Sequence, residues 1–163
     1  MAPKLEKTFT MRGYINKENT LDLKAIKTGP QRIIVPIVSG FVKGSGLDAE
    51  ILPGGADWIL LDPPSNIAHI DVRTQARASN GHSLYIHYIG VLKMDEGAQK
   101  VLGWASDAKT TQVGDHHWFN QPIIETSDPE FKWVEDCVWN GQGHFVVDER
   151  GSAVEYEIYK VTN

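Results

Sequence analysis

Hydrophobic and polar positions alternate through much of the chain, as expected for strands with one face turned to a core. The clearest case is residues 67–78, where the apolar positions 68, 70 and 72 alternate with His69, Asp71 and Arg73. Gly- and Pro-containing turn signals separate such segments. The pattern predicts strands over about residues 5–12, 31–42, 47–52, 57–62, 67–78, 83–92, 100–107, 112–125, 137–148 and 153–161.

One short helix is predicted near residues 128–135. Ser127 is placed to cap it, Pro129 stands early where its missing N–H costs nothing, and Glu130 completes a capping box. The chain contains no internal repeat and no linker, so residues 1–163 are expected to form a single domain. Nine or ten strands at short spacing predict an all-β, antiparallel fold, either a barrel or a sandwich.

The Asn80-Gly81 pair is the strongest hairpin signal, because a type I′ turn needs positive φ at both central residues. A two-residue loop there would place Val72 opposite Ile89 and Arg73 opposite Tyr88. His69, Asp71 and Arg73 would then share a face with Leu84, Ile86 and Tyr88, so neither face of the hairpin would be purely polar. Mixed faces favour a β-barrel with a lipocalin-like central cavity over a sandwich.

Composition supports the β assignment. Val, Ile, Thr, Tyr, Phe and Trp together number 51 residues, against 24 for Ala, Leu and Met, which excludes a helical bundle. The net charge of -5 argues against nucleic acid as a partner. No apolar run is long enough to span a membrane, and the N-terminus lacks the apolar stretch of a secretory signal. Cys137 is the one cysteine, which fits a reducing compartment, so a cytoplasmic location is expected.

Three segments carry a resemblance to a known family. They are a Gly-rich strand at residues 40–46, Pro53-Gly54-Gly55-Ala56-Asp57-Trp58, and Asp71-Val72-Arg73. With the Asn80-Gly81 hairpin they resemble the pattern of the domain-of-unknown-function family 3237. Further matching positions are Phe119, Pro122, Glu125, Phe131, Trp133, Tyr156 and Tyr159, whereas Ile124 stands where the family often has Phe.

The resemblance implies a small closed β-barrel with a central pocket. Some fungal members of the family are similar to tailoring enzymes of secondary metabolism that close rings without a cofactor. They add a hydroxyl across an alkene, or perform a hetero-Diels–Alder step through a quinone methide. The resemblance therefore predicts a cyclase of lyase or isomerase type, a pericyclase such as a hetero-Diels–Alderase, that needs no cofactor.

Two groups of residues are the candidates for chemistry. Asp57 is expected at a pocket mouth as general acid or base, beside Trp58 as a flat wall for a conjugated substrate. The alternative is a turn carboxylate with a core indole. His69, Asp71 and Arg73 would supply an acid and a cation to a dehydration step if they face the barrel interior. Their alternative is a ladder of charges facing solvent.

Other residues are expected to shape the pocket and bind the substrate: Tyr88, Trp104, Trp118, Glu125 and Trp133. No metal site is expected, because no established ligand spacing is present. His116 and His117 must point to opposite faces of a strand, so at most one of them can enter a site, and which one stays open.

The sequence hypothesis is a cofactor-independent enzyme that acts on a conjugated, oxygenated natural product inside a barrel, by acid–base dehydration and ring closure. A non-catalytic carrier barrel is the alternative, and a purely structural domain is a third reading. The substrate is a small molecule in each ligand-binding case. The sequence leaves open whether the chain forms a homodimer.

Overall fold

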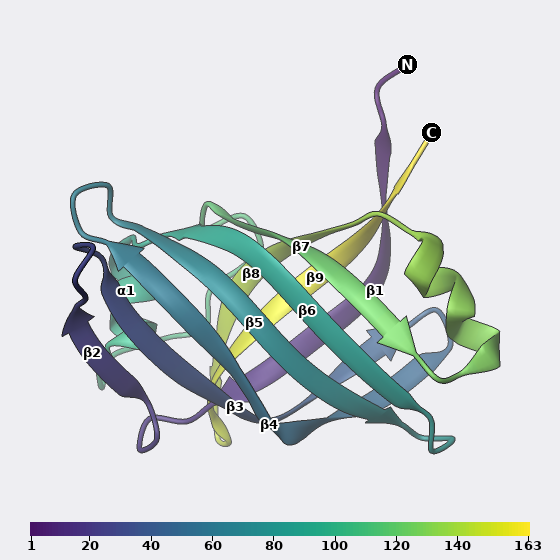
Figure 1. Ribbon diagram of the computed structural model, residues 1–163, viewed down its shortest axis with the longest axis horizontal. Helices are drawn as coiled ribbons and strands as arrows, with labels where there is room; N and C mark the ends of the chain where they lie inside the picture. Colours follow the sequence, from purple (N-terminus) through teal and green to yellow (C-terminus); the bar gives the residue numbers. More distant parts are fainter.

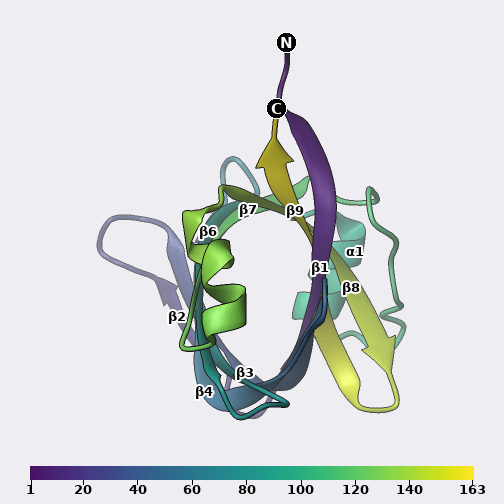
Figure 2. The ribbon, with the colours of Figure 1, turned by 90° about the vertical axis from the view of Figure 1, so that its right-hand side faces the viewer.

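The computed structural model describes residues 1–163 as a closed antiparallel β-barrel with two short helices (Figures 1 and 2). The strands are β1 (Lys4–Ile15), β2 (Leu21–Ala25), β3 (Gln31–Gly44), β4 (Leu47–Asp62), β5 (Ile67–Ala78), β6 (Ser83–Lys93), β7 (Trp118–Thr126), β8 (Trp139–Asp148) and β9 (Gly151–Thr162). They follow the order β1-β9-β8-β7-β6-β5-β4-β3-β2, and β1 also pairs with β3. Eight strands therefore close the barrel, and β2 is an extra strand beside β3.

The all-β barrel predicted from the sequence is confirmed, but several elements differ from the expectation. The segments 47–52 and 57–62 form one long strand, β4. The strand expected at 100–107 is wrong. Helix α1 (Glu96–Leu102) occupies this region, and it begins where the Asp95 side chain accepts a hydrogen bond from the Ala98 N–H. Neither helix is long and apolar enough to cross a membrane.

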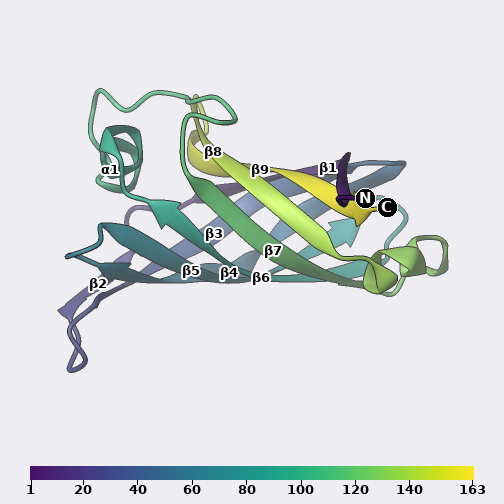
Figure 3. The same cartoon turned by 90° about the horizontal axis from the view of Figure 1, so that it is seen from above.

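The second helix lies where the sequence predicted it and differs in its cap. Pro129–Asp136 forms a 3₁₀ helix, η1, at the opposite end of the barrel from α1 (Figure 3). Its first turn is capped by Asp128, which accepts from the Glu130 N–H, whereas Ser127 bonds to the N–H of Ser83. Asp128 also accepts from the Asn80 side chain at 2.6 Å, which ties η1 to the β5–β6 turn.

The register of the β5–β6 hairpin is one residue away from the sequence expectation. Val72 lies opposite Tyr88, and Asp71 lies opposite Ile89. The Ala78 N–H donates to the His82 carbonyl, so the loop between the paired residues contains three residues, 79–81, and not the two assumed for Asn80-Gly81. Because side chains alternate with period two, the shift changes which residues of β6 share a face with His69, Asp71 and Arg73. These three residues lie on the outer face of the barrel, not in its interior.

The barrel interior is filled by large side chains, which corrects the expectation of a wide central cavity. The largest fully buried side chains are Trp118, Tyr88, Tyr156, Phe9 and Phe145. Where β7 places a large side chain inside the barrel, β8 has a glycine. A Cβ on Gly143 would lie 2.5 Å from the Trp118 ring. At the α1 end, a hollow of about 40 Å³ is lined by apolar residues such as Val35, Ile59 and Met94.

Candidate functional site

The wall between β4 and β5 is interrupted beside Asp57. Paired residues are found at Asp57 with Val72 and at Leu60 with His69, but none are found at the two positions between. The backbone N–H of Asp71 instead donates to Oδ1 of Asp57 at 3.1 Å. Because Asp57 lies opposite two buried residues, Val35 on β3 and Val72 on β5, its side chain belongs to the inner face.

The surroundings of Asp57 raise the pKa of its carboxyl. Burial raises the pKa of Asp57 to about 7, although the hydrogen bond from the Asp71 N–H acts in the opposite direction. The charge of Asp71 raises this pKa further, and the guanidinium of Arg32 lowers it. Part of Asp57 stays accessible to solvent, yet protein surrounds it on both sides within the sheet. A carboxyl with this pKa is suited to both donate and accept a proton near pH 7.

Behind Asp57 lies an interior polar cluster, which we define as Asp57, Thr74, Tyr88, Asn120 and Tyr156. The rings of Tyr88 and Tyr156 meet edge to face with centroids 5.2 Å apart. Burial, together with the charge of Asp57, raises the pKa of both phenols, so both stay protonated. The Thr74 hydroxyl is buried without a hydrogen-bond partner, and the buried Asn120 amide has no partner other than the Tyr156 hydroxyl, whose pKa it lowers. A buried polar group without a partner costs about 1–3 kcal/mol, so the cluster favours a role beyond packing.

On the outer face, Asp71 joins two other side chains. Its Oδ1 lies 3.1 Å from Nη1 of Arg73 and 3.1 Å from Nε2 of His87. His87 lies directly opposite Arg73 on β6. Asp71 thus orients an imidazole with its carboxylate while its backbone N–H holds Asp57 inside the wall. This one residue connects the outer face to the interior polar cluster.

An outer groove of about 580 Å³ crosses β3 to β8 beside these residues. The residues that line the groove include Arg32, Trp58, His69, Asp71, Ile89 and Phe119. The guanidinium of Arg32 is held by its Nη1, which donates to the Trp58 carbonyl at 2.6 Å. Three residues predicted from the sequence, Trp58, His69 and Asp71, therefore meet at one groove, with Asp57 in the adjoining wall.

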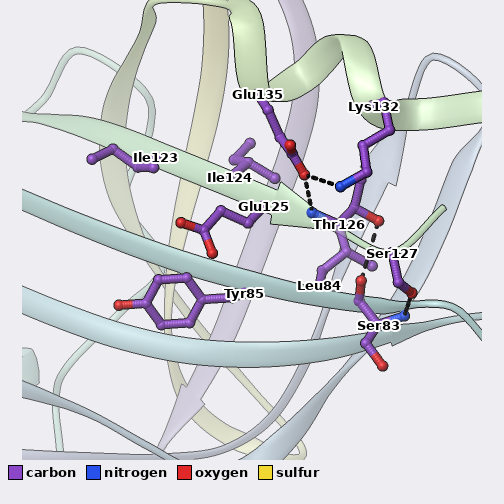
Figure 4. Close-up of a pocket in the computed structure, with 10 residues that line it drawn as sticks. All are labelled: Ser83, Leu84, Tyr85, Ile123, Ile124, Glu125, Thr126, Ser127, Lys132 and Glu135. Carbon is purple, nitrogen blue, oxygen red and sulfur yellow. Dashed lines mark hydrogen bonds and ion pairs between the residues drawn. The ribbon is translucent and has the colours of Figure 1, made fainter. Parts of the chain in front are cut away.

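A larger hollow, of about 670 Å³, lies near η1 and contains the predicted residue Glu125 (Figure 4). Glu125 and Tyr85 make no hydrogen bond there, but most of the other polar groups at its rim are paired with each other. Glu135 accepts from Lys132 at 2.8 Å and from the Thr126 N–H at 2.9 Å, and Ser127 accepts from the Ser83 N–H. We therefore place the candidate site at the outer groove, which is smaller but lies next to the titratable groups.

The structure separates the other predicted binding residues from the outer groove. Tyr88 and Trp118 are in the interior, and Tyr88 belongs to the polar cluster. Trp104 follows α1 with a φ of 58°, and it packs on the core. Trp133 lies on η1 and stacks on Phe9, with ring centroids 6.1 Å apart. None of these four lines the groove beside Trp58.

Sequence reasoning missed five residues of the site: Arg32, Thr74, His87, Asn120 and Tyr156. The correct hairpin register would have found His87, because it stands opposite Arg73. Tyr156 was noted only as a position of family resemblance, and Asn120 carried no local signal. The structure contains no group of three His, Cys, Asp or Glu residues arranged to hold a metal ion.

Comparison with known proteins supports a family assignment. The profile of the family described as "Protein of unknown function (DUF3237)" matches residues 3–161. A UPF0311 protein of Rhodopseudomonas palustris is 24% identical, covering 86% of this chain and 89% of its own. PR-toxin biosynthesis cluster protein 7 of Penicillium roqueforti is 25% identical, covering 84% of this chain and 76% of its own.

Solved structures share the barrel. A conserved protein of unknown function from Rhodopseudomonas palustris superposes with a TM-score of 0.82 at 20% identity, over 99% of both chains. A crystal structure described as an enzyme from Penicillium herquei superposes with a TM-score of 0.58 at 12% identity, over 99% of this chain and 96% of that one. At these identities the similarity establishes the fold.

Proposed function

The chain belongs to the DUF3237 family, and from this premise we propose that it is a cofactor-independent enzyme that tailors a small, conjugated, oxygenated natural product. The similarity to a protein of the PR-toxin biosynthesis cluster supports a tailoring role in secondary metabolism. The observation that carries the proposal is Asp57. Its carboxyl has a pKa raised to about 7 and stands in the wall between the outer groove and two buried phenols.

In the proposed reaction, the substrate lies in the outer groove with its conjugated ring against Trp58. The leaving hydroxyl reaches Asp57 through the unpaired stretch of the β4–β5 wall, where neutral Asp57 gives it a proton, the C–O bond breaks and water departs. A phenol or enol oxygen of the substrate loses its proton to bulk base, which leaves a neutral conjugated electrophile such as a quinone methide. Arg32 and His69 face the groove and would stabilise negative charge on the substrate oxygen.

Ring closure then requires mainly positioning. An alkene of the same molecule adds to the electrophile without proton transfer; alternatively a hydroxyl adds through its oxygen, its proton passes to the Asp57 carboxylate, and the former carbonyl oxygen takes a proton from bulk water. The groove holds the two partners close together. Such positioning supplies about 7–11 kcal/mol of the barrier in well-oriented intramolecular reactions, so few catalytic groups are needed. Asp71 is a positioning residue in this scheme, because its backbone N–H holds the Asp57 carboxyl and its side chain holds His87.

The test is a screen of phenolic, tropolone and polyketide-type compounds by thermal shift, followed by mass spectrometry of any compound that binds. We expect at least one compound to be dehydrated or cyclised. Asp57→Asn should retain binding and lower turnover by about 10²–10⁴-fold, which is the usual contribution of a general acid. Asp48→Asn, on the same strand but exposed, should leave turnover unchanged. Binding without turnover by the wild type would support a carrier instead.

A further inference from the structure

A second group of reactive side chains lies at the α1 end of the barrel, away from the outer groove. His116 is buried, and only 3% of its side chain is exposed. Its Nδ1 lies 2.7 Å from Oδ2 of Asp95, and its Nε2 lies 2.9 Å from Oγ1 of Thr111. This settles the orientation left open by the sequence: His116 points inward and His117 is exposed.

The hydrogen bonds fix where the protons are. Although burial opposes it, the N–H of Ala98 and the imidazole of His116 lower the pKa of Asp95, so Asp95 is a carboxylate that can only accept. Nδ1 of His116 must therefore carry a proton, and in the neutral ring Nε2 is left as an acceptor. Thr111 Oγ1 already accepts from the Phe145 N–H at 3.0 Å, so its own proton is free to point at Nε2.

Carboxylate, imidazole and hydroxyl in this order are the arrangement of an activated nucleophile. Thr111 is also reachable, because it is half-buried and lines a hollow of about 320 Å³ with Gly97, Lys100 and Lys109. Lys100 is occupied by Glu96 at 3.0 Å and Asp107 at 2.9 Å. Lys109 is exposed and has no carboxylate within ion-pair distance, and the two lysines and two carboxylates that line the hollow balance in formal charge.

We propose that Thr111, His116 and Asp95 form a second reactive site that accepts an acyl group from a small ester or thioester. Oγ1 of Thr111 attacks the carbonyl carbon while its proton passes to Nε2 of His116. The tetrahedral intermediate then expels the alcohol or thiol, which takes that proton. Water releases the acyl group by the same steps in reverse order.

The experiment incubates the full chain with p-nitrophenyl acetate and locates the acetyl group by peptide mass spectrometry. We expect acetyl transfer to Thr111. His116→Gln should slow the transfer by about 10²-fold or more, as for loss of a general base. Thr111→Val should abolish it, and Thr111→Ser should retain it at the same position. Asp57→Asn should leave the labelling unchanged, which separates this site from the proposed function.

A matched control is available in the preceding residue. Thr110 accepts from the Val147 N–H and donates to the Val147 carbonyl but does not contact His116, so Thr110→Val should leave the acetylation of Thr111 unchanged. Acetyl groups found only on lysines, or equal rates for the wild type and His116→Gln, would overturn the proposal. In either case the three residues would serve only to fasten the loop after α1 to β8.

Discussion

The carboxyl of Asp57 and the backbone N–H of Asp71 are joined by a hydrogen bond of 3.1 Å that replaces a rung of the β4–β5 ladder. The bond holds an acid inside the wall of the barrel, where burial raises its pKa. The same strand position turns the Asp71 side chain outward to Arg73 and His87. The acid–base chemistry of the protein should therefore depend on both residues, in different ways.

The first prediction concerns stability and pH. The pKa of Asp57 is raised from 3.8 to about 7 in the folded chain, so the folded state holds this proton more tightly than the unfolded state does. The stabilising contribution is complete below about pH 4 and is lost as the pH rises through about 7. The full difference corresponds to at most roughly 4 kcal/mol. Asp57→Asn removes this dependence. The free energy of unfolding of the variant, relative to that of the wild type, should therefore rise between pH 4 and pH 8.

Urea denaturation at several pH values measures this effect. Asp48→Asn is the control, because Asp48 is an exposed residue of the same strand. If the wild type and Asp57→Asn show parallel stability profiles across this range, Asp57 is not a buried acid with a raised pKa.

The second prediction concerns the charges on either side of Asp57. Asp71 raises the pKa of Asp57 and Arg32 lowers it. Asp71→Asn should therefore lower that pKa, and Arg32→Gln should raise it. Titration of the Asp57 carboxyl carbon by NMR measures both. Shifts of the same sign in the two variants would refute this electrostatic assignment.

The sequence predicted the barrel because its alternation of apolar residues is governed by strand geometry, which is local. It also named Asp57, Trp58, His69 and Asp71 as candidates, in two separate groups, and in the structure these four residues lie near each other at the β4–β5 wall. The face of His69, Asp71 and Arg73 could not be predicted from the turn residues alone. The Asn80-Gly81 pair is part of a three-residue loop, 79–81, closed by Ala78 and His82, and a shift of one residue reverses a strand's faces.

Long-range packing explains the other differences. The filled interior depends on Trp118, Tyr88 and Tyr156, which come from three strands far apart in sequence. Glycines on β8 leave space for inward side chains such as Trp118. The spacing of these glycines along the sequence does not indicate which side chain each of them faces. Asn120 illustrates this limit, since only the closed barrel brings its amide beside Gly141.

The third prediction follows from that contact. A Cβ on Gly141 would lie 2.0 Å from Oδ1 of Asn120, so Gly141→Ala should lower the free energy of unfolding by about 1–3 kcal/mol. Asn120→Ala removes the three atoms that lie nearest to this Cβ, so the double variant should recover most of the loss. Gly143→Ala is the control: its Cβ would meet Trp118, and Asn120→Ala should not rescue it. Additive losses for Gly141 and Asn120 in denaturation experiments would contradict this packing.

The last prediction distinguishes the outer groove from the barrel interior as the place of substrate binding. Ile89 and Ile123 are both on the outer face and are almost equally exposed, at 55% and 56%. Ile89 lines the outer groove with Trp58, whereas Ile123 lies outside that groove. Ile89→Lys removes apolar contact from the groove and should weaken binding by about tenfold or more. Ile123→Lys makes the same change in charge and should leave binding unchanged. Isothermal titration with a compound from the screen measures both variants. Because neither side chain reaches the interior, unchanged affinity in both would place the ligand inside the barrel, and the proposed role of the groove would be wrong.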